Sequence, residues 1–144
     1  MAELNFTPEQ RAAIDTRGST VLVSAAAGSG KTRVLTERLM AYLTDTENPV
    51  DIDRFLVITY TRAAAAELRS RILDGIYARI ASDPENRRLR RQVALCARAE
   101  IGTIHSFCAD FLRANCAALA LAPDFQVADT ERCAALRAAA LEHT

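Results

Sequence analysis

Residues 25–32 (AAAGSGKT) contain, at a fixed spacing, the residue types that bind phosphate groups. Gly28 and Gly30 allow a tight turn in which successive backbone N–H groups point at one anion. Lys31 is the only lysine in the chain, and it stands where a phosphate loop places the cation that reaches the terminal phosphates. The Thr32 hydroxyl stands where such a loop ligates Mg²⁺. The pattern predicts a site for the phosphates and Mg²⁺ of a nucleotide such as ATP.

One position departs from the general loop pattern, which has a glycine where this chain has Ala25. The alanine is harmless if its φ is negative, because only a left-handed conformation favours glycine. The alternative is that an alanine-, glycine- and serine-rich turn merely joins two elements. The residues expected to line the site are Ala25, Ala26, Ala27, Gly28, Ser29, Gly30, Lys31, Thr32 and Arg33, with Lys31 in the catalytic role.

Three apolar, β-prone runs alternate with helical patterns along the chain. Residues 20–24 precede the loop, and residues 55–60 and 100–104 form the other two runs. This alternation predicts the α/β class, with a parallel sheet flanked by helices. We expect residues 55–60 to be buried on both faces, since their apolar residues do not alternate with polar ones. The carboxyl ends of the three strands should meet at one edge, where ligands of such sheets bind.

The helix ahead of the loop begins with a recognisable cap. Thr7 is a good N-cap, Pro8 suits the first helical position, and Gln10 completes a Thr-x-x-Gln capping box, with the helix reaching about Asp15. Gln10 has a second possible role, because a side-chain amide can pair with both edges of an adenine. The sequence leaves both roles open.

Two further helices are predicted between the second and third strands. Leu68, Ile72, Ile76 and Ile80 recur every four residues on one helix face, which should end at residues 82–84. Residues 85–99 predict the next helix, whose arginine cluster forms either a solvated face or a phosphate-contacting patch. The members of that cluster are Arg87, Arg88, Arg90 and Arg91.

Composition narrows the class of protein. The 144 residues include 18 basic and 18 acidic ones, and 50% are hydrophobic, which argues against disorder and against a nonspecific polybasic binder. No apolar run approaches the ~18 residues of a membrane span, and the N-terminus does not resemble a secretory signal. We therefore expect a cytoplasmic protein without a membrane partner. The four cysteines lack zinc-site spacing and should be small buried hydrophobes; they are Cys96, Cys108, Cys116 and Cys133.

These motifs, in this order, resemble the N-terminal part of a superfamily 1A DNA helicase of the UvrD/Rep type. Residues 6–10 resemble the Q motif of that family, in which glutamine reads adenine, and residues 25–32 match its motif I, where alanine at the first position is ordinary. Residues 59–65 look like motif Ia, and residues 102–107 look like a later DNA-contacting motif. The alanine run before Glu67 most resembles the AddA and RecB motor subunits of bacterial helicase–nuclease complexes, which resect double-strand breaks.

The resemblance implies a P-loop NTPase of RecA-like fold. Residues 1–124 would be the N-terminal part of its motor domain 1A, and residues 125–144 the start of an inserted helical subdomain, 1B. It also implies ATP and Mg²⁺ as cofactors, single- and double-stranded DNA as partners, and a second, AddB-like subunit.

Short hydroxyls, an aromatic ring and an arginine at the strand ends suit the implied contact with single-stranded DNA. The alternatives are that Tyr60 is a core aromatic and His105 a structural hydrogen-bonding residue. The residues expected to contact DNA are Thr59, Tyr60, Thr61, Arg62, Thr103, His105 and Ser106.

The sequence lacks a clear source for the two carboxylates that ATP hydrolysis needs. The nearest candidate is Asp129, after residues 125–128, but Thr130 follows where a glutamate is usual. We therefore expect a fragment of a longer motor that binds ATP without turning it over. The alternatives are a complete small nucleotide-binding module and a phosphotransferase.

Overall fold

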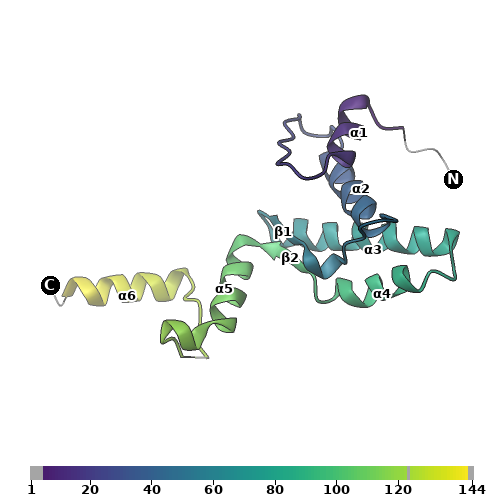
Figure 1. Ribbon diagram of the computed structural model, residues 1–144. Helices are drawn as coiled ribbons and strands as arrows, with labels where there is room; N and C mark the ends of the chain where they lie inside the picture. Colours follow the sequence, from purple (N-terminus) through teal and green to yellow (C-terminus); the bar gives the residue numbers. More distant parts are fainter. Residues whose placement is uncertain (1–4, 123, 143–144) are drawn as a thin grey trace. The chain divides into compact units, whose positions relative to one another are not determined.

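The computed structural model describes residues 5–122 and 124–142, which form two compact units divided between Thr103 and Ile104. The first unit holds helices α1 (Pro8–Asp15), α2 (Lys31–Leu43), α3 (Arg62–Ser82) and α4 (Arg87–Cys96), the 3-10 turn η1 (Ile52–Arg54), and strands β1 (Leu56–Thr59) and β2 (Glu100–Thr103) (Figure 1). The second unit holds α5 (Ile104–Ala114), the 3-10 turn η2 (Cys116–Leu119) and α6 (Thr130–Glu142).

Strands β1 and β2 form a two-stranded parallel sheet, which confirms the predicted α/β class and strand direction. The register pairs Leu56 with Glu100 and Thr59 with Thr103. The connection between the strands runs through α3 and α4, because parallel strands need a long crossover. Both strands therefore end at the same edge of the sheet.

The predicted strand at residues 20–24 is wrong in this structure. These residues form no strand, and the side chain of Leu22 is 93% exposed. A strand is defined by hydrogen bonds to a neighbour, and among the described residues β1 and β2 pair only with each other. Apolar, β-prone composition was therefore insufficient to predict pairing at this segment.

Strand β1 was also predicted to be buried on both faces, and only one of its faces is. Val57 packs into the core, whereas Leu56 is 50% exposed and Ile58 is also exposed. Helix α3 contacts both strands, and the side chains of Leu56 and Ile58 are exposed among the described residues. The lack of alternation in this run therefore reflects one buried face and one apolar face that is open within the described residues.

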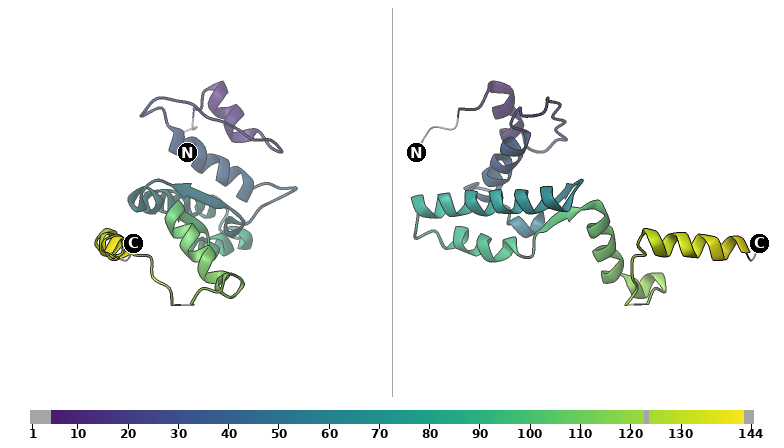
Figure 2. Two further views of the ribbon diagram at one scale, coloured as in Figure 1. Left: turned by 90° about the vertical axis from the view of Figure 1, so that its left-hand side faces the viewer. Right: turned by 180° about the vertical axis from the view of Figure 1, so that it is seen from behind.

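Helix α3 forms the centre of the first unit. Leu68, Ile72 and Ile76 are buried as their four-residue spacing predicts, and they pack with Met40 and the other core residues of α2, η1 and the sheet. Figure 2 shows α3 and α4 lying side by side. Burying these apolar side chains is the main source of stability for the unit.

Gln92 of α4 is fully buried and joins that helix to the chain leading into β1. Its side-chain oxygen accepts the backbone N–H of Ile52 at 2.9 Å, and its amide nitrogen donates to Asp51 Oδ1 at 2.7 Å. A buried polar side chain is stable only when its donors and acceptors are paired, and these two bonds supply that pairing. They hold η1 against α4.

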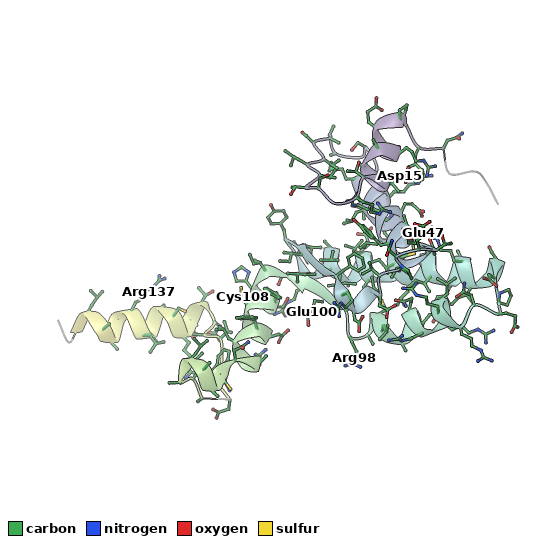
Figure 3. All side chains as sticks on the ribbon, viewed as in Figure 1. Asp15, Glu47, Arg98, Glu100, Cys108 and Arg137 are labelled. Carbon is green, nitrogen blue, oxygen red and sulfur yellow. The ribbon has the colours of Figure 1, made fainter. Side chains whose placement is uncertain are left out.

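The arginine cluster of α4 is largely occupied within the protein. Arg88 and Arg91 form ion pairs with Asp51, at 2.9 and 3.4 Å, and Arg90 donates to the carbonyl of Pro84. Arg87, Arg90 and Arg91 are exposed, as a solvated face requires, and Arg88 is partly buried. A phosphate contact by this cluster stays a prediction. Beyond the helix, Arg98 and Glu100 are exposed near the start of β2 (Figure 3).

The second unit is helical. The ring centroids of Phe107 and Phe111 are 6.1 Å apart on one side of α5, as expected for residues four apart in a helix. Residues 125–129 form no strand, and the Asp129 carboxylate accepts the Arg132 backbone N–H at 2.8 Å, where it caps α6. Asp129 therefore caps a helix and does not follow a strand.

The cysteines differ in burial. Cys96 is buried in the core, as expected, but Cys108 is exposed and Cys116 and Cys133 are partly exposed, so the prediction of four buried thiols is wrong. Among the described residues, no helix is long and apolar enough to cross a membrane.

Candidate nucleotide site and sheet edge

The capping box predicted for α1 is present. Thr7 is the N-cap, its hydroxyl accepts the Gln10 backbone N–H at 3.3 Å, and the Gln10 side-chain oxygen accepts the Thr7 backbone N–H at 3.0 Å. Two backbone donors that a helix start leaves unpaired are thereby satisfied. The box fixes the side chain of Gln10 at the start of α1.

The same glutamine also contacts the glycine-containing loop. Its amide nitrogen donates to the backbone carbonyl of Ser29 at 3.1 Å. The side chain thus uses its oxygen for the cap and its nitrogen for the loop. The sequence presented capping and nucleotide-site roles as alternatives, and the structure places the capping residue beside the candidate nucleotide loop. Reading of adenine by Gln10 stays a prediction.

The loop has the backbone geometry that its glycines predict. Gly28 and Gly30 have φ values of 78° and 85°, in the left-handed region where side chains with a Cβ are strained. Among the described residues, Ala120 is the only non-glycine with a positive φ, so Ala25 does not need to be glycine. The departure from the general pattern is therefore harmless to the backbone.

Helix α2 begins at Lys31, directly after Gly30, and its first turn carries basic side chains and no acidic one. The ammonium group of Lys31 donates to the carbonyls of Ala25 and Ala26 at 2.7 and 2.6 Å. Cations at the N-terminus of a helix face the positive end of its dipole, which is unfavourable by itself. The turn therefore combines a helix dipole, the N–H groups of a helix start and two cations, Lys31 and Arg33, an arrangement that suits an anion.

A depression of about 220 Å³ lies between α1, the loop and α2. Its lining residues are Thr7, Glu9, Gln10, Ala13, Val23, Ser24, Ala25, Ser29, Lys31 and Val34. The predicted residues Gln10, Ala25, Ser29 and Lys31 are thus brought together. Glu9 was not predicted here; hydrogen bonds from its own backbone N–H and from the Thr7 hydroxyl lower its pKa. The sequence could have indicated Glu9, because it is an acidic residue in the first turn of a predicted helix, where a negative charge is favourable.

The residues fit Mg²⁺ only in part. Thr32 lies in the first turn of α2 and is an exposed residue, so a ligand can reach it. Among the described residues, no three or more His, Cys, Asp and Glu side chains are grouped as a metal site. A Mg²⁺ ion held through Thr32 would take its remaining ligands from phosphate oxygens and water.

The second candidate site is the edge where β1 and β2 end. Thr59 and Thr103 are paired in register there. The Thr59 hydroxyl donates to the Thr61 carbonyl at 2.9 Å, and the Thr61 hydroxyl caps α3 by accepting the Ala64 backbone N–H at 3.1 Å. Two of the predicted hydroxyls therefore shape the turn from β1 into α3.

Tyr60 and Arg62 are exposed at this turn. The side chain of Tyr60 is fully exposed, so the alternative that it is a core aromatic is wrong. Arg62 is the first residue of α3. An exposed ring beside a helix N-terminus offers a stacking surface next to backbone N–H donors.

His105 and Ser106 lie in the first turn of α5, in the second unit. His105 is exposed, and Ser106 is partly exposed. The chain places them directly after Thr103 and Ile104. Their contact with DNA stays a prediction.

Phe6 contacts Arg33, one of the residues predicted for the nucleotide site, but was not itself predicted from the sequence. Its ring lies under the guanidinium groups of Arg33, at 4.7 Å, and Arg11, at 5.3 Å. The available signal was its position immediately before the N-cap, where an apolar residue often packs against the helix.

A family model described as the UvrD/REP helicase N-terminal domain matches residues 6–144. An ATP-dependent helicase/nuclease subunit of Clostridium acetobutylicum is 49% identical over 142 residues, 99% of this chain and 11% of that protein. A protein of the same name from Thermoanaerobacter sp. (strain X514) is 53% identical over 86% of this chain and 10% of its own length. Another from Pelotomaculum thermopropionicum is 50% identical over 95% of this chain and 11% of its own length. This chain thus spans about a tenth of the curated relatives it matches.

Proposed function

The chain belongs to the UvrD/REP helicase N-terminal domain family, and we propose that it is the ATP-binding part of a DNA helicase motor. In this role, residues 25–32 bind the phosphates, Lys31 reaches the terminal phosphate, and Thr32 ligates Mg²⁺. Hydrolysis of the bound Mg-ATP would supply the free energy of translocation in the longer motor, and the residues of this chain would hold the Mg-ATP.

The observation that carries the proposal is the contact between Gln10 and the loop. Gln10 and Ser29 stand 19 residues apart in the sequence, and the 3.1 Å hydrogen bond between them joins the two motifs beside one depression. A turn that merely linked two elements would not require an amide from another helix. A site for a base and its phosphates requires both in one place.

We place the contact with single-stranded DNA at the edge where β1 and β2 end. Backbone N–H groups at the start of α3 and the Arg62 side chain would grip phosphates, and the exposed Tyr60 ring would stack on a base. Such stacking tolerates any sequence, as translocation demands. Thr59, Thr61 and Thr103 complete the proposed contact at this edge. His105 and Ser106, in the second unit, are proposed separately to contact DNA.

The longer protein, we propose, is an AddA-type helicase–nuclease motor that acts with a second, AddB-like subunit in the cytoplasm to process double-strand breaks. The relatives are called helicase/nuclease subunits, which supports this assignment. The present chain alone is proposed to bind Mg-ATP without turnover. Asp129, the nearest candidate for a catalytic carboxylate, caps α6 instead.

The test measures binding and turnover of Mg-ATP by this chain, with and without single-stranded DNA, beside Lys31→Ala. Micromolar to millimolar binding that the variant loses, without turnover, is expected. Turnover that Lys31→Ala abolishes would show that the catalytic carboxylates are within these residues. Equal binding by both proteins would overturn the assignment of the loop.

A further inference from the structure

Phe6 joins the beginnings of two helices through its ring. It precedes the N-cap Thr7 of α1, and its partners come from different elements: Arg11 from α1 and Arg33 from the first turn of α2. Both guanidinium carbons lie within the ~6 Å of a ring centroid at which a cation is attracted to the π-face. The ring is therefore a contact point between α1 and the start of the loop helix.

The contact with Arg11 belongs to the architecture of the cap. Counting from the N-cap, Arg11 stands four residues after Thr7, where an apolar residue usually packs against the residue before the cap. Here the partner is an arginine, so a cation–π contact replaces the usual apolar one. The capping box and this contact together fix where the Phe6 ring lies.

The contact with Arg33 has no such structural reason. Arg33 is exposed, stands in the first turn of α2, and faces an unfavourable helix dipole. An arginine without a partner there would extend into solvent. Contact with the Phe6 ring, whose centroid lies 4.7 Å from the guanidinium carbon, instead holds the guanidinium group beside the loop. A planar guanidinium held there can stack on a second flat group.

We propose that Phe6 is a positioning residue for the base of the bound nucleotide. It acts through Arg33: the ring fixes the guanidinium plane, and the plane presents a stacking surface for the purine next to the phosphate site. This inference rests on the proposed function. It predicts that Phe6 contributes to binding of the base and not to binding of the phosphates.

The experiment compares the affinities of the chain for Mg-ATP and for magnesium tripolyphosphate, which has the phosphates without the base. Phe6→Leu keeps apolar volume and removes the π-face, and should weaken ATP binding about two- to five-fold while leaving tripolyphosphate unchanged. Phe6→Tyr keeps the π-face and should retain the affinity for ATP. Phe111→Leu, at an exposed phenylalanine of α5, is the matched control and should change neither.

The same measurements separate the two proposals. If Phe6→Leu weakened the affinity for both ligands equally, or for neither, the positioning role would be overturned. The Lys31→Ala result would still support nucleotide binding in that case. In an Arg33→Ala background, Phe6→Leu should have no further effect on ATP, and an undiminished effect would also overturn the role. If the unaltered chain binds neither ligand, the proposed function fails and this inference fails with it.

Discussion

The side-chain amide of Gln10 donates to the backbone carbonyl of Ser29 at 3.1 Å while its oxygen caps α1. One side chain therefore ties the first helix to the glycine-containing loop. Since each bond uses a different atom of the amide, a single substitution can remove one and keep the other.

Gln10→Glu is the substitution that separates the two bonds. A glutamate retains an oxygen for the Thr7 N–H but has no proton for Ser29 when ionised, and it would face the carbonyl unfavourably. We expect near-normal helix content and affinity for Mg-ATP lowered about ten-fold, the effect of one lost bond of ~1.4 kcal/mol. Calorimetric titration and circular dichroism measure the two quantities.

Gln10→Ala provides the comparison because it removes both bonds. It should also weaken ATP binding, and it should lower the free energy of unfolding by about 0.5–2 kcal/mol through loss of the cap. If Gln10→Glu bound ATP as well as the unaltered chain, the contact with Ser29 would have no part in nucleotide binding.

The buried amide of Gln92 should be critical for stability. Gln92→Leu retains apolar volume but leaves the buried Ile52 N–H without its acceptor and removes one donor from Asp51, which keeps its ion pairs with Arg88 and Arg91. The free energy of unfolding should therefore fall by about 1–3 kcal/mol. Urea denaturation followed by far-UV circular dichroism measures it, with the midpoint lowered at constant slope. Gln126→Leu, at an exposed glutamine, is the control and should stay within about 0.5 kcal/mol. Equal effects of the two substitutions would contradict the structural role of Gln92.

Features fixed by local sequence were predicted well. The capping box of Thr7 and Gln10 depends on residues three apart, and the buried face of α3 depends on the four-residue spacing of Leu68, Ile72 and Ile76. The positive φ values of Gly28 and Gly30 follow from the absence of a Cβ, so the loop could also be located from sequence.

Features fixed by distant partners were missed. Residues 20–24 have strand-like composition but no paired neighbour among the described residues, and composition does not reveal a missing neighbour. The contact between Phe6 and Arg33 and the bonds of Gln92 join segments far apart in the sequence, through side chains whose spacing has no local period. Only packing of the helices defines them.

Because of the buried Cys96 thiol, the free energy of unfolding should decrease at alkaline pH. Burial raises its pKa, against a smaller opposite effect of the Arg69 guanidinium, so the folded state holds the proton more tightly than the unfolded state. The free energy of unfolding should therefore be unaffected well below the unfolded value of about 8.5 and fall as the pH rises through it. Urea denaturation between neutral pH and about pH 10 measures the fall. Cys96→Ala removes the titrating group, and an identical slope in that variant would contradict the prediction.

Tyr60 and Tyr77 are both exposed tyrosines, but only Tyr60 lies at the edge where the strands end. Tyr60→Ala should leave the free energy of unfolding within about 0.5 kcal/mol, because the ring has no packing to lose. If the ring stacks on a base, the same substitution should weaken binding of a single-stranded oligonucleotide about five- to a hundred-fold, from a stacking contribution of ~1–3 kcal/mol. Tyr77→Ala, toward the C-terminal end of α3, should bind the oligonucleotide like the unaltered chain. Fluorescence anisotropy at fixed salt measures the affinities, and equal affinity of all three proteins would exclude Tyr60 from the DNA contact.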